Sequence, residues 1–424
     1  MGLWCYRWLS LGGRLTLAKI VLESLSVYWL SLYKLPKSIL IGLRHKITSF
    51  IWSANGRDNK LHLARWELLS KPKSFGGWGL RDLDLFGRGL RMKNCWRALH
   101  STNLWSKILI DKYLKGLSTQ PWLATNLISI GNISPIWHGF MDIIPEIRKH
   151  LAWLIGSGSN VRVGIDKFIG GEGTFSLSDG LVQHFHFKGY FTLDHLRTYS
   201  QDRWGYWLGS TYFHLREPWK GEWDNYLSNL GRMGVTLSQG ADRMLWTKNT
   251  VDGGVTSKSA YEHLIANRVR NTERWWAHVF WKWQVPLKLK CFFSLVLHNK
   301  ILTWDNLCRW GWHGPGLYPH CRSDSESIHH LFITCCFARK LWQSICMVLG
   351  IQWTVTQESV EEVFRQWMRK ASEQSGLIIF ICWGIWLSRN AMVFNDHQPN
   401  HFLTGMRIIN QYKEFYRRRS GLNK

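Results

Sequence analysis

The chain has 424 residues, and its 54 lysines and arginines against 29 aspartates and glutamates give a formal net charge of +25 at pH 7. A positive excess of this size favours a polyanionic partner. Hydrophobic residues make up 45% and charged residues 20% of the chain, a balance typical of globular proteins, which excludes a disordered basic tail for most of it. At about 100–200 residues per domain, the length predicts two to four domains.

Targeting signals and the cysteine pattern exclude further classes of protein. No apolar run reaches the roughly 20 residues that span a bilayer, and the best candidate, Leu377 to Leu387, has about half that length. The first residues fit neither a myristoylation signal nor a secretory signal peptide, so we expect a cytoplasmic or nuclear protein that is neither secreted nor transmembrane. The 9 cysteines are thinly spread, which excludes a disulfide framework and favours reduced thiols or a metal site.

The N-terminal part has helical periodicity. Leu9 to Arg14 forms a polar, glycine-containing turn that leads directly into this pattern, as in the middle of a longer protein. Apolar residues from Leu15 to Leu32 recur at spacings of three and four and predict a widely buried helix that ends at Pro36. A second helix is predicted from Ile39 to Trp52, followed by a turn cluster at Ser53 to Asn59.

A glycine-rich block, Gly76-Gly77-Trp78-Gly79-Leu80, follows these helices. Its glycines permit a close backbone approach, either to a phosphate or to the protein itself. The lysine that a phosphate-binding P-loop requires after its glycines is missing, which favours a structural turn. Residues 82–115 then show helical periodicity again.

The centre of the chain is less regular. Between 116 and 240 glycine, serine and asparagine interrupt the pattern, and Asn160 to Ile165 and Phe185 to Phe191 are predicted as short strands. Arg243 to Ser257 is predicted as a hairpin and is followed by a helix. Two amphipathic helices separated by Pro286 are expected between 275 and 307, and an exposed helix with an acidic first turn is expected from 357 to 369.

The window from Tyr318 to Phe337 is rich in cysteine and histidine. Zn²⁺ sites use four sulfur or nitrogen ligands, usually a Cys-x-x-Cys pair and a second pair that one short turn brings close. Cys321, His330 and Cys335 fit three ligand positions, but Tyr318 occupies the place of the first cysteine, and a neutral phenol is a poor zinc ligand. His320, His329 and Cys336 are substitute ligands without the usual spacing. Two hypotheses follow: a bound Zn²⁺, and a metal-free finger held by apolar residues, which we favour.

Several blocks of the sequence resemble the reverse transcriptases of plant non-LTR (long interspersed element) retrotransposons, downstream of their catalytic palm. The similar segments are Leu9 to Lys19, Phe50-Ile51-Trp52, Trp66, Gly76 to Leu83, a weakened Gly156 to Arg162 block with Asp166, Trp246, Ser257 to Tyr261, Pro286 to Thr303, the window 318–337, and Trp383 to Phe394. The resemblance covers most of the chain.

The resemblance implies a mainly α protein in four parts. These are a thumb-like helical region at 1–115, a loop-rich connector with small β elements at 116–240, a reverse-transcriptase zinc-binding-like domain at 241–349 and a helical basic tail at 350–424. It also implies Cys321, His330 and Cys335 as the remaining ligands of the family's zinc site, with zinc doubtful because that site is incomplete.

Catalytic carboxylates of the family are not recognisable. Two-metal polymerisation needs clustered carboxylates to hold Mg²⁺, and no Tyr-Ala-Asp-Asp-like pair precedes the thumb-like block. We therefore expect a chain without a Mg²⁺ site that is not an enzyme by itself, with a polymerase palm as a partner in trans.

Two functions of different classes remain. The first is low-specificity binding of RNA or an RNA–DNA duplex, in which lysines contact phosphates and tryptophans beside them stack on bases. The residues predicted for it are Lys71, Lys73, Trp78, Lys282, Lys288, Lys290 and Lys300, with Trp281 as a further stacking candidate. The alternative is a decayed retroelement fragment without selected activity. A protein-interaction module built on apolar surface around Trp383 and Trp386 is a third, weaker hypothesis.

Overall fold

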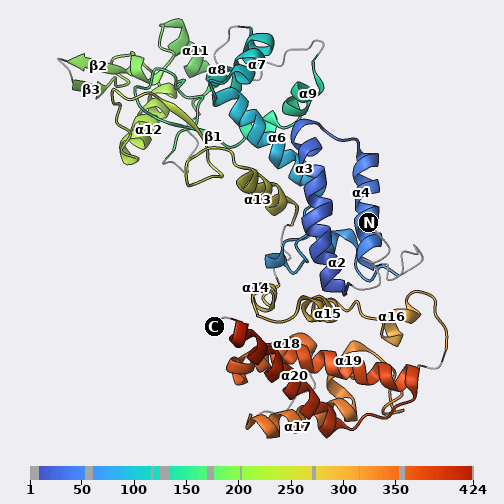
Figure 1. Cartoon of the computed structure of the whole chain (residues 1–424). Helices are drawn as coiled ribbons and strands as arrows, with labels where there is room; N and C mark the ends of the chain where they lie inside the picture. Colours follow the sequence, from blue (N-terminus) through green and yellow to red (C-terminus); the bar gives the residue numbers. More distant parts are fainter. Residues whose placement is uncertain are drawn as a thin grey trace. The chain divides into compact units, whose positions relative to one another are not determined.

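The computed structural model describes residues 9–52, 61–115, 119–124, 133–169, 176–200, 203–269, 274–314, 316–352 and 359–422. Within these ranges helices dominate and the strands are few and short, so the predicted mainly α class is confirmed (Figure 1). The turn cluster predicted at Ser53 to Asn59 lies outside the described residues.

The chain divides into two compact units, each built from separate stretches of sequence. Unit 1 comprises 1–26, 36–82 and 269–424, and unit 2 comprises 27–35 and 83–268. The four successive segments predicted from the sequence are therefore not the compact units of the structure. The prediction assumed that each domain is one continuous stretch of sequence. In the structure the N-terminal helices instead bury their apolar faces in the same unit as residues 269–424.

Unit 1 is helical in all its described parts. Its elements are α2 (Leu11–Leu17), a π-helical turn (Ala18–Leu22), the start of α3 (Glu23–Leu32), α4 (Lys37–Trp52), α5 (Trp66–Ser70), α14 (Ala277–Phe280), α15 (Leu287–Leu297), α16 (Trp304–Cys308), a second π-helical turn (His330–Thr334), α17 (Cys336–Leu349), α18 (Val360–Lys370), α19 (Leu377–Asn395) and α20 (His401–Leu422). In it α20 packs on α17 and α19, and α15 packs on α2 and α19. The predicted helix at 39–52 is confirmed, and 15–32 is helical as predicted, with a π-helical turn inside it. The wide buried face predicted for 15–32 is wrong, because Ile20, Leu25 and Trp29 are exposed.

A close approach of α2 to α15 joins the two parts of unit 1. A Cβ atom on Gly12 would lie 2.7 Å from the backbone nitrogen of Lys288, so only glycine leaves room for this contact. The two segments are more than 270 residues apart in sequence, and both belong to blocks that carry the family resemblance.

The glycine-rich block folds as a structural turn, as predicted. A Cβ on Gly77 would lie 2.2 Å from the carbonyl oxygen of Lys71. Trp78 is fully buried, and its indole Nε1 donates a hydrogen bond of 3.1 Å to Ser294 Oγ on α15. The glycines therefore let the backbone fold tightly enough to insert this tryptophan into the core.

Unit 2 combines helices with two small antiparallel sheets. Its elements are the rest of α3, α6 (Leu83–His100), α7 (Leu104–Leu114), α8 (Thr119–Ala124), α9 (Pro135–Met141), α10 (Ile144–Arg148), β1 (Leu151–Leu154), α11 (Asp179–Phe187), β2 (Arg197–Ser200), β3 (Arg203–Trp207), α12 (Trp219–Arg232), β4 (Arg243–Trp246) and α13 (Ser257–Arg268). Helix α13 packs on α6, and the sheets pair β1 with β4 and β2 with β3 (Figure 1).

Three local predictions in unit 2 are wrong. Residues 185–187 end α11 instead of starting a strand, and Phe185 packs from this helix against Phe213 and Trp223, whereas Phe187 is exposed. Asn160 to Ile165 is an irregular loop with one isolated bridge. Strand β4 pairs with the distant β1, Leu151 opposite Trp246, instead of forming a hairpin with the residues after it.

Two helical stretches are long and apolar enough to cross a membrane by length and composition, Leu11–Leu32 and Leu377–Asn395. The apolar run counted in the sequence ends at Leu387, whereas the helix continues through polar residues to Asn395. In the structure 61% of its apolar window is buried among other helices, which is what a core helix of a folded protein shows.

Candidate metal centre and nucleic-acid interface

A tight loop from Leu317 to Ser325 presents the first sulfur ligand. An isolated antiparallel bridge joins Leu317 to Ser325 and closes the loop. Inside it the N–H of Tyr318 donates to the carbonyl of Asp324 at 2.8 Å, and the N–H of Arg322 donates to the carbonyl of Tyr318 at 2.8 Å. These bonds turn Cys321 inward toward the helices that follow.

Two further ligands come from the segment after the loop. His330 opens the π-helical turn, and Cys335 immediately precedes α17. The Nε2 atom of His330 lies 3.1 Å from Cys321 Sγ, and the ligand atoms of Cys321, His330 and Cys335 all lie within 4.8 Å of one another. The structure thus brings together the three residues that the sequence predicted, as a group that could hold a metal ion.

A buried ion pair fixes the loop to α19. Glu326 accepts hydrogen bonds from Arg389 Nε at 2.6 Å and from its second guanidinium nitrogen at 2.8 Å, and both side chains are buried. The same carboxylate also accepts the N–H of Trp304 at 3.1 Å. Arg389, which carried part of the family resemblance, therefore has a structural role in holding the ligand loop.

The two cysteines differ electrostatically. Burial alone would raise the pKa of Cys321, but hydrogen bonds from Ser323 and from the backbone N–H of Asp324 outweigh it and lower this pKa. Burial raises the pKa of Cys335 to about 12, although the N–H groups of Ala338 and Phe337 at the start of α17 act in the opposite direction. Cys321 therefore loses its proton more readily than Cys335, whose ionisation a neighbouring cation would favour.

Tyr318 occupies the fourth position, and it is fully buried. Its ring stands edge-on to His330, with centroids 5.5 Å apart, and its hydroxyl has no hydrogen-bond partner in the described part of the chain. Burial, followed by the nearby Cys335 and Glu326, raises the pKa of this phenol well above its ordinary value. A neutral phenol there supplies no charge to a metal, so the donor set fits Zn²⁺ with three ligands and not with four.

None of the substitute ligands joins the group. The ring of His320 stacks on Phe337, with centroids 4.5 Å apart, and His329 and Cys336 are exposed. The described ligand group therefore consists of Cys321, His330 and Cys335 alone.

A basic cleft lies in unit 1. It has a volume of about 1030 Å³, and four cationic side chains line it from segments far apart in sequence: Arg65, Lys71, Arg274 and Lys300. Two carboxylates, Glu67 and Glu361, and three aromatic residues, Phe75, Trp275 and Trp310, share the lining.

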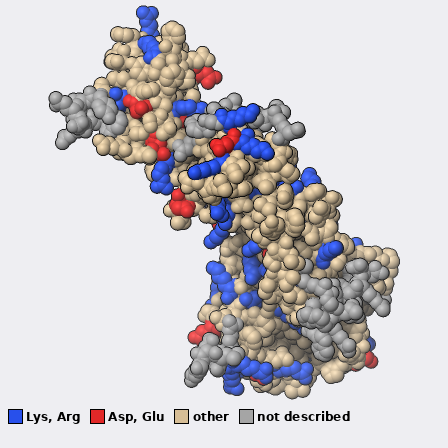
Figure 2. All heavy atoms as spheres, turned by 45° about the horizontal axis from the view of Figure 1, so that its top comes forward, with Lys and Arg blue, Asp and Glu red and all other residues tan. Residues whose placement is uncertain are grey.

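Cationic side chains outnumber carboxylates in the lining of this cleft, where Arg274 is paired with Glu361 at 3.5 Å. His298 lines it and lies within hydrogen-bond distance of the Gly76 carbonyl, Nε2 to oxygen 3.0 Å. The pKa of His298 is lowered by burial first and then by Arg274, Lys71 and Lys300. On the face of the molecule drawn in Figure 2, Lys and Arg side chains far outnumber Asp and Glu, in keeping with the net charge of +25. Such a concave basic lining attracts phosphates.

Aromatic residues of the cleft differ in accessibility. Trp310 is 41% exposed, whereas Trp275 is half-buried and held by its own contacts, an Nε1 hydrogen bond of 2.8 Å to Glu361 and the Arg365 guanidinium over its ring. Trp310 is therefore the described aromatic side chain of the cleft best placed to stack on a base.

Most of the residues predicted to contact nucleic acid lie outside the lining of the cleft. Lys71 and Lys300 line the cleft, but Lys73 lies over the buried Trp281 ring, and Lys290 donates to the Trp281 carbonyl at 3.0 Å. Lys288 lies over the ring of Trp383, and Lys282 is exposed outside the cleft lining. Much of the predicted basic set thus packs on tryptophans of the protein itself.

The stacking role predicted for Trp78 is contradicted by its position. Its ring is 0% exposed and contacts Trp52, and its Nε1 is used inside the core. Trp281, at 6% exposed, is equally inaccessible to a base. Both residues were predicted because lysines stand near them in sequence, but Trp78 is enclosed by the core and Lys73 lies over the ring of Trp281.

Sequence reasoning missed Arg65, Arg274 and Trp310. Arg65 precedes the short helix α5, and Arg274 and Trp310 lie beside turns, so no periodic pattern marked them. The segment Trp310-Gly311-Trp312 offered one clue, since two tryptophans around a turn glycine are hard to bury together. Trp312 is in fact 56% exposed.

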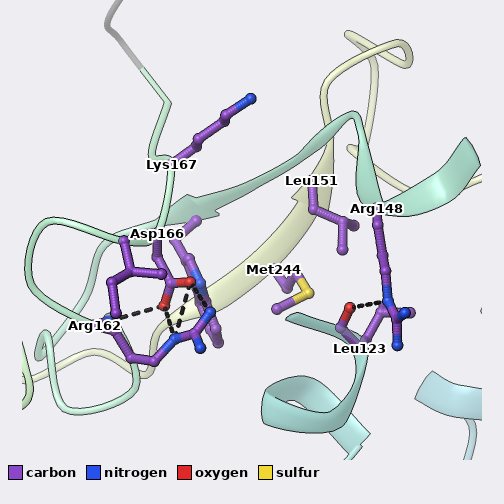
Figure 3. A pocket seen from close by; sticks show the side chains of 9 residues that line it. Leu123, Arg148, Leu151, Arg162, Asp166, Lys167 and Met244 are labelled. Atoms are coloured by element: carbon purple, nitrogen blue, oxygen red, sulfur yellow. Dashed lines mark hydrogen bonds and ion pairs between the residues drawn. The ribbon is translucent and has the colours of Figure 1, made fainter. Parts of the chain in front are cut away.

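A smaller hollow in unit 2, of about 160 Å³, also has basic walls (Figure 3). Arg162 is paired with Asp166 at 2.5 Å, and Arg148 donates to the carbonyl of Leu123 at 2.8 Å. The arginine charges are thus used within the fold. Asp166, which echoed a family block, has this structural role.

Comparisons with known proteins place the three candidate ligands within a known family of domains. A protein of Arabidopsis thaliana that its name provisionally calls a ribonuclease H protein is 29% identical over 344 residues, which cover 80% of this chain and 53% of the relative. An uncharacterized mitochondrial protein of the same plant is 29% identical over 149 residues, 34% of this chain and 93% of the relative. The chain thus spans about half the length of the first relative. Residues 255–342, which include all three ligands, match the family described as zinc-binding in reverse transcriptase, and the predicted resemblance to reverse transcriptases is confirmed.

Proposed function

We propose that the chain is a downstream part of a retrotransposon-type reverse transcriptase and that its unit 1 binds RNA or an RNA–DNA duplex through the basic cleft. The observation that carries the proposal is the convergence of Arg65, Lys71, Arg274 and Lys300 on one hollow surface. These residues come from two of the three stretches of unit 1, 36–82 and 269–424, and Lys300 and Arg274 lie within the matched zinc-binding range.

The cleft suits a phosphate backbone better than a specific sequence. Guanidinium and ammonium groups contact phosphates without reading bases, so we expect tight but unselective binding. Trp310 adds a stacking surface, and each stacked base contributes about 1–3 kcal/mol in single-stranded complexes. Single-stranded RNA should therefore gain more from Trp310 than a fully paired duplex does.

Polymerisation by this chain alone is not part of the proposal. Two-metal catalysis uses neighbouring carboxylates, and the sequence contains no Tyr-Ala-Asp-Asp-like pair. The function we propose is a grip on template or duplex, with a catalytic palm supplied from elsewhere.

Zinc has a supporting role in this proposal. Bound by Cys321, His330 and Cys335, Zn²⁺ would tie the 317–325 loop to the start of α17 and let Cys335 ionise. The ion would stabilise the finger-like fold, and the buried ring of Tyr318 would pack at the fourth ligand position.

The test is binding across a salt series, with a Trp310→Ala variant. The full chain is titrated against fluorescent single-stranded RNA and against an RNA–DNA duplex from low to near-physiological salt. A scrambled basic protein of equal charge serves as the control. We expect the chain to stay bound at salt concentrations that release the control protein. Trp310→Ala should weaken RNA binding by about 5- to 150-fold.

Trp312→Ala is the matched control variant, because Trp312 is also exposed but does not line the cleft. Equal losses of RNA affinity in the two variants would mean that RNA binds elsewhere and would refute the cleft as the binding site. Binding that disappears with salt as fast as that of the scrambled protein would leave only charge, and the alternative of a decayed fragment without selected activity would then stand.

The third hypothesis, an interaction module at Trp383 and Trp386, loses its basis. Both rings are half-buried and contact Phe292, with centroid distances of 4.9 and 6.0 Å. Contacts with Phe292 of α15 thus use part of the apolar surface that this hypothesis required.

A further inference from the structure

A second group of metal-ligating side chains lies in unit 2, away from the cysteine site. Glu146 belongs to α10, His150 ends the turn between α10 and β1, and His263 lies on α13. The first two are four residues apart, and the third is more than 110 residues further along the chain. The fold of unit 2, not the sequence spacing, brings these side chains together.

The donor atoms of this group are close to one another. Glu146 Oε1 lies 2.9 Å from His263 Nε2, the rings of His150 and His263 have centroids 4.5 Å apart, and all three ligand atoms lie within 4.8 Å of one another. Ligands of a tetrahedral Zn²⁺ ion, bound at about 2.0–2.1 Å, stand about 3.3 Å apart. Small side-chain rotations therefore suffice to place an ion between them.

The backbone around the group is held in place. The carbonyl of His150 accepts both the N–H and the hydroxyl of Thr247, at 2.8 and 3.1 Å, where β4 ends beside β1. The ring of Trp246 stands edge-on to His263 at 5.7 Å. Two ligands thus have fixed positions before any ion binds, which reduces the ordering cost of binding.

We propose that Glu146, His150 and His263 form a binding site for a divalent transition-metal ion, with Zn²⁺ as the ion that the site takes. Two imidazoles and one carboxylate are a donor set that zinc uses in proteins, with one position left for water. All three residues are partly buried.

Charges around the site agree with this assignment. The ring of His150 faces that of His263, and an imidazole nitrogen is a common zinc ligand. Lys149 pairs with Glu146 through the other carboxylate oxygen, Oε2, at 3.2 Å and leaves Oε1 facing the histidines. The side-chain amide of Asn267 lies 3.3 Å from His263 Nε2 and adds a polar neighbour.

A bound ion would clamp α13 to the turn between α10 and β1. Since α13 packs on α6, the clamp would join the helical part of unit 2 to its β1–β4 sheet. This site is independent of the proposed nucleic-acid cleft, because every ligand belongs to unit 2 and the cleft belongs to unit 1.

The experiment measures Zn²⁺ and Co²⁺ binding by the full chain in a Cys321→Ser/Cys335→Ser background, which removes the sulfur site. We expect one equivalent of Zn²⁺ to remain. The Co²⁺ complex should show ligand-field bands without the thiolate charge-transfer band that a cysteine site gives. Adding His263→Gln should weaken Zn²⁺ binding by more than about tenfold, and Zn²⁺ should raise the unfolding temperature of the background protein but not of this variant.

Two companion variants keep the test decisive. Glu146→Gln preserves a hydrogen-bonding side chain beside His263 but removes the charge, so weakened Zn²⁺ binding with an unchanged circular dichroism spectrum supports metal ligation. His138→Gln changes an exposed histidine of the same unit and should leave binding unchanged. Absence of Zn²⁺ binding in the background protein, or equal losses in His138→Gln and His263→Gln, would overturn the site and leave Glu146–His263 as an ordinary hydrogen bond.

Discussion

Tyr318 shows how one side chain alters a site whose other ligands are in place. Its ring stands beside His330, and its hydroxyl is buried without a partner in the described structure. An unsatisfied buried hydroxyl costs about 1–3 kcal/mol, so this residue stabilises the loop through its ring alone.

We predict that Tyr318→Cys creates a four-ligand zinc site. The new thiolate would complete a Cys₃His set with Cys321, His330 and Cys335 and add negative charge next to the ion. Zinc affinity, measured by competition with a chromophoric chelator, should rise at least about 100-fold over the wild-type chain.

Tyr318→Ser is the control, because it opens the same space without supplying a thiolate. A gain for serine equal to that for cysteine would mean that relief of crowding, not ligation, was limiting. No gain for either would mean that Cys321, His330 and Cys335 do not act as ligands.

At the level of elements, the glycines of the first resembling block matter through packing. Helix α2 reaches α15 only because Gly12 has no side chain, and the atoms that a Cβ would meet belong to the backbone at Leu287 and Lys288. A backbone neighbour cannot rotate away as a flexible side chain can. The two helices must therefore separate if the glycine is replaced.

We predict that Gly12→Ala destabilises unit 1 by about 1–3 kcal/mol, the usual cost of overpacking. The intrinsic helix preference of alanine offsets about 1 kcal/mol of that cost at most. Chemical denaturation followed by tryptophan fluorescence measures the change.

Gly42→Ala, on the exposed face of α4 in the same unit, is the matched control. A Cβ there meets nothing within 4 Å, so this variant should be neutral or more stable. If Gly12→Ala is as stable as Gly42→Ala, the close approach of α2 and α15 is not a constraint on the fold.

At the scale of the whole molecule, the question is whether the net charge of +25 acts diffusely or through the cleft. Diffuse charge would make any two exposed cations equivalent. A binding cleft would make the cations that line it count for more than cations elsewhere.

We predict that Arg65→Gln/Lys300→Gln weakens single-stranded RNA binding and reduces its salt dependence. Each lost phosphate contact on a single strand lowers the slope of log affinity against log salt by about 0.7, so two contacts lower it by about 1.4. Fluorescence anisotropy at several salt concentrations gives the slope.

Lys340→Gln/Lys413→Gln removes the same charge from exposed positions of unit 1 outside the cleft lining, and its slope should stay close to wild type. Equal slopes for the two double variants would show that the charge acts as a diffuse field and that the cleft is not the binding surface.

Much of the fold and of the metal site could be predicted from residue spacing. Helical periodicity located α4 and α6, and the short distance in sequence from Cys321 to Cys335 left few ways to arrange its ligands. Local features of this kind depend on neighbours a few residues away, which the sequence displays directly. Predictions failed where the partner was distant, as for β4, which pairs with β1 about 90 residues earlier.

The sequence by itself determined the basic character, the mainly α class, the family resemblance and the three candidate ligands Cys321, His330 and Cys335. Only the tertiary structure decided that Trp78 is buried, that Lys71 and Lys300 share a cleft with Arg65 and Arg274, and that His150 meets His263. The physical reason is that exposure and proximity depend on which distant segments pack together to bury their apolar faces. A lysine or tryptophan looks the same in the sequence whether it lies in the core or at the surface, and only tertiary packing distinguishes these two environments.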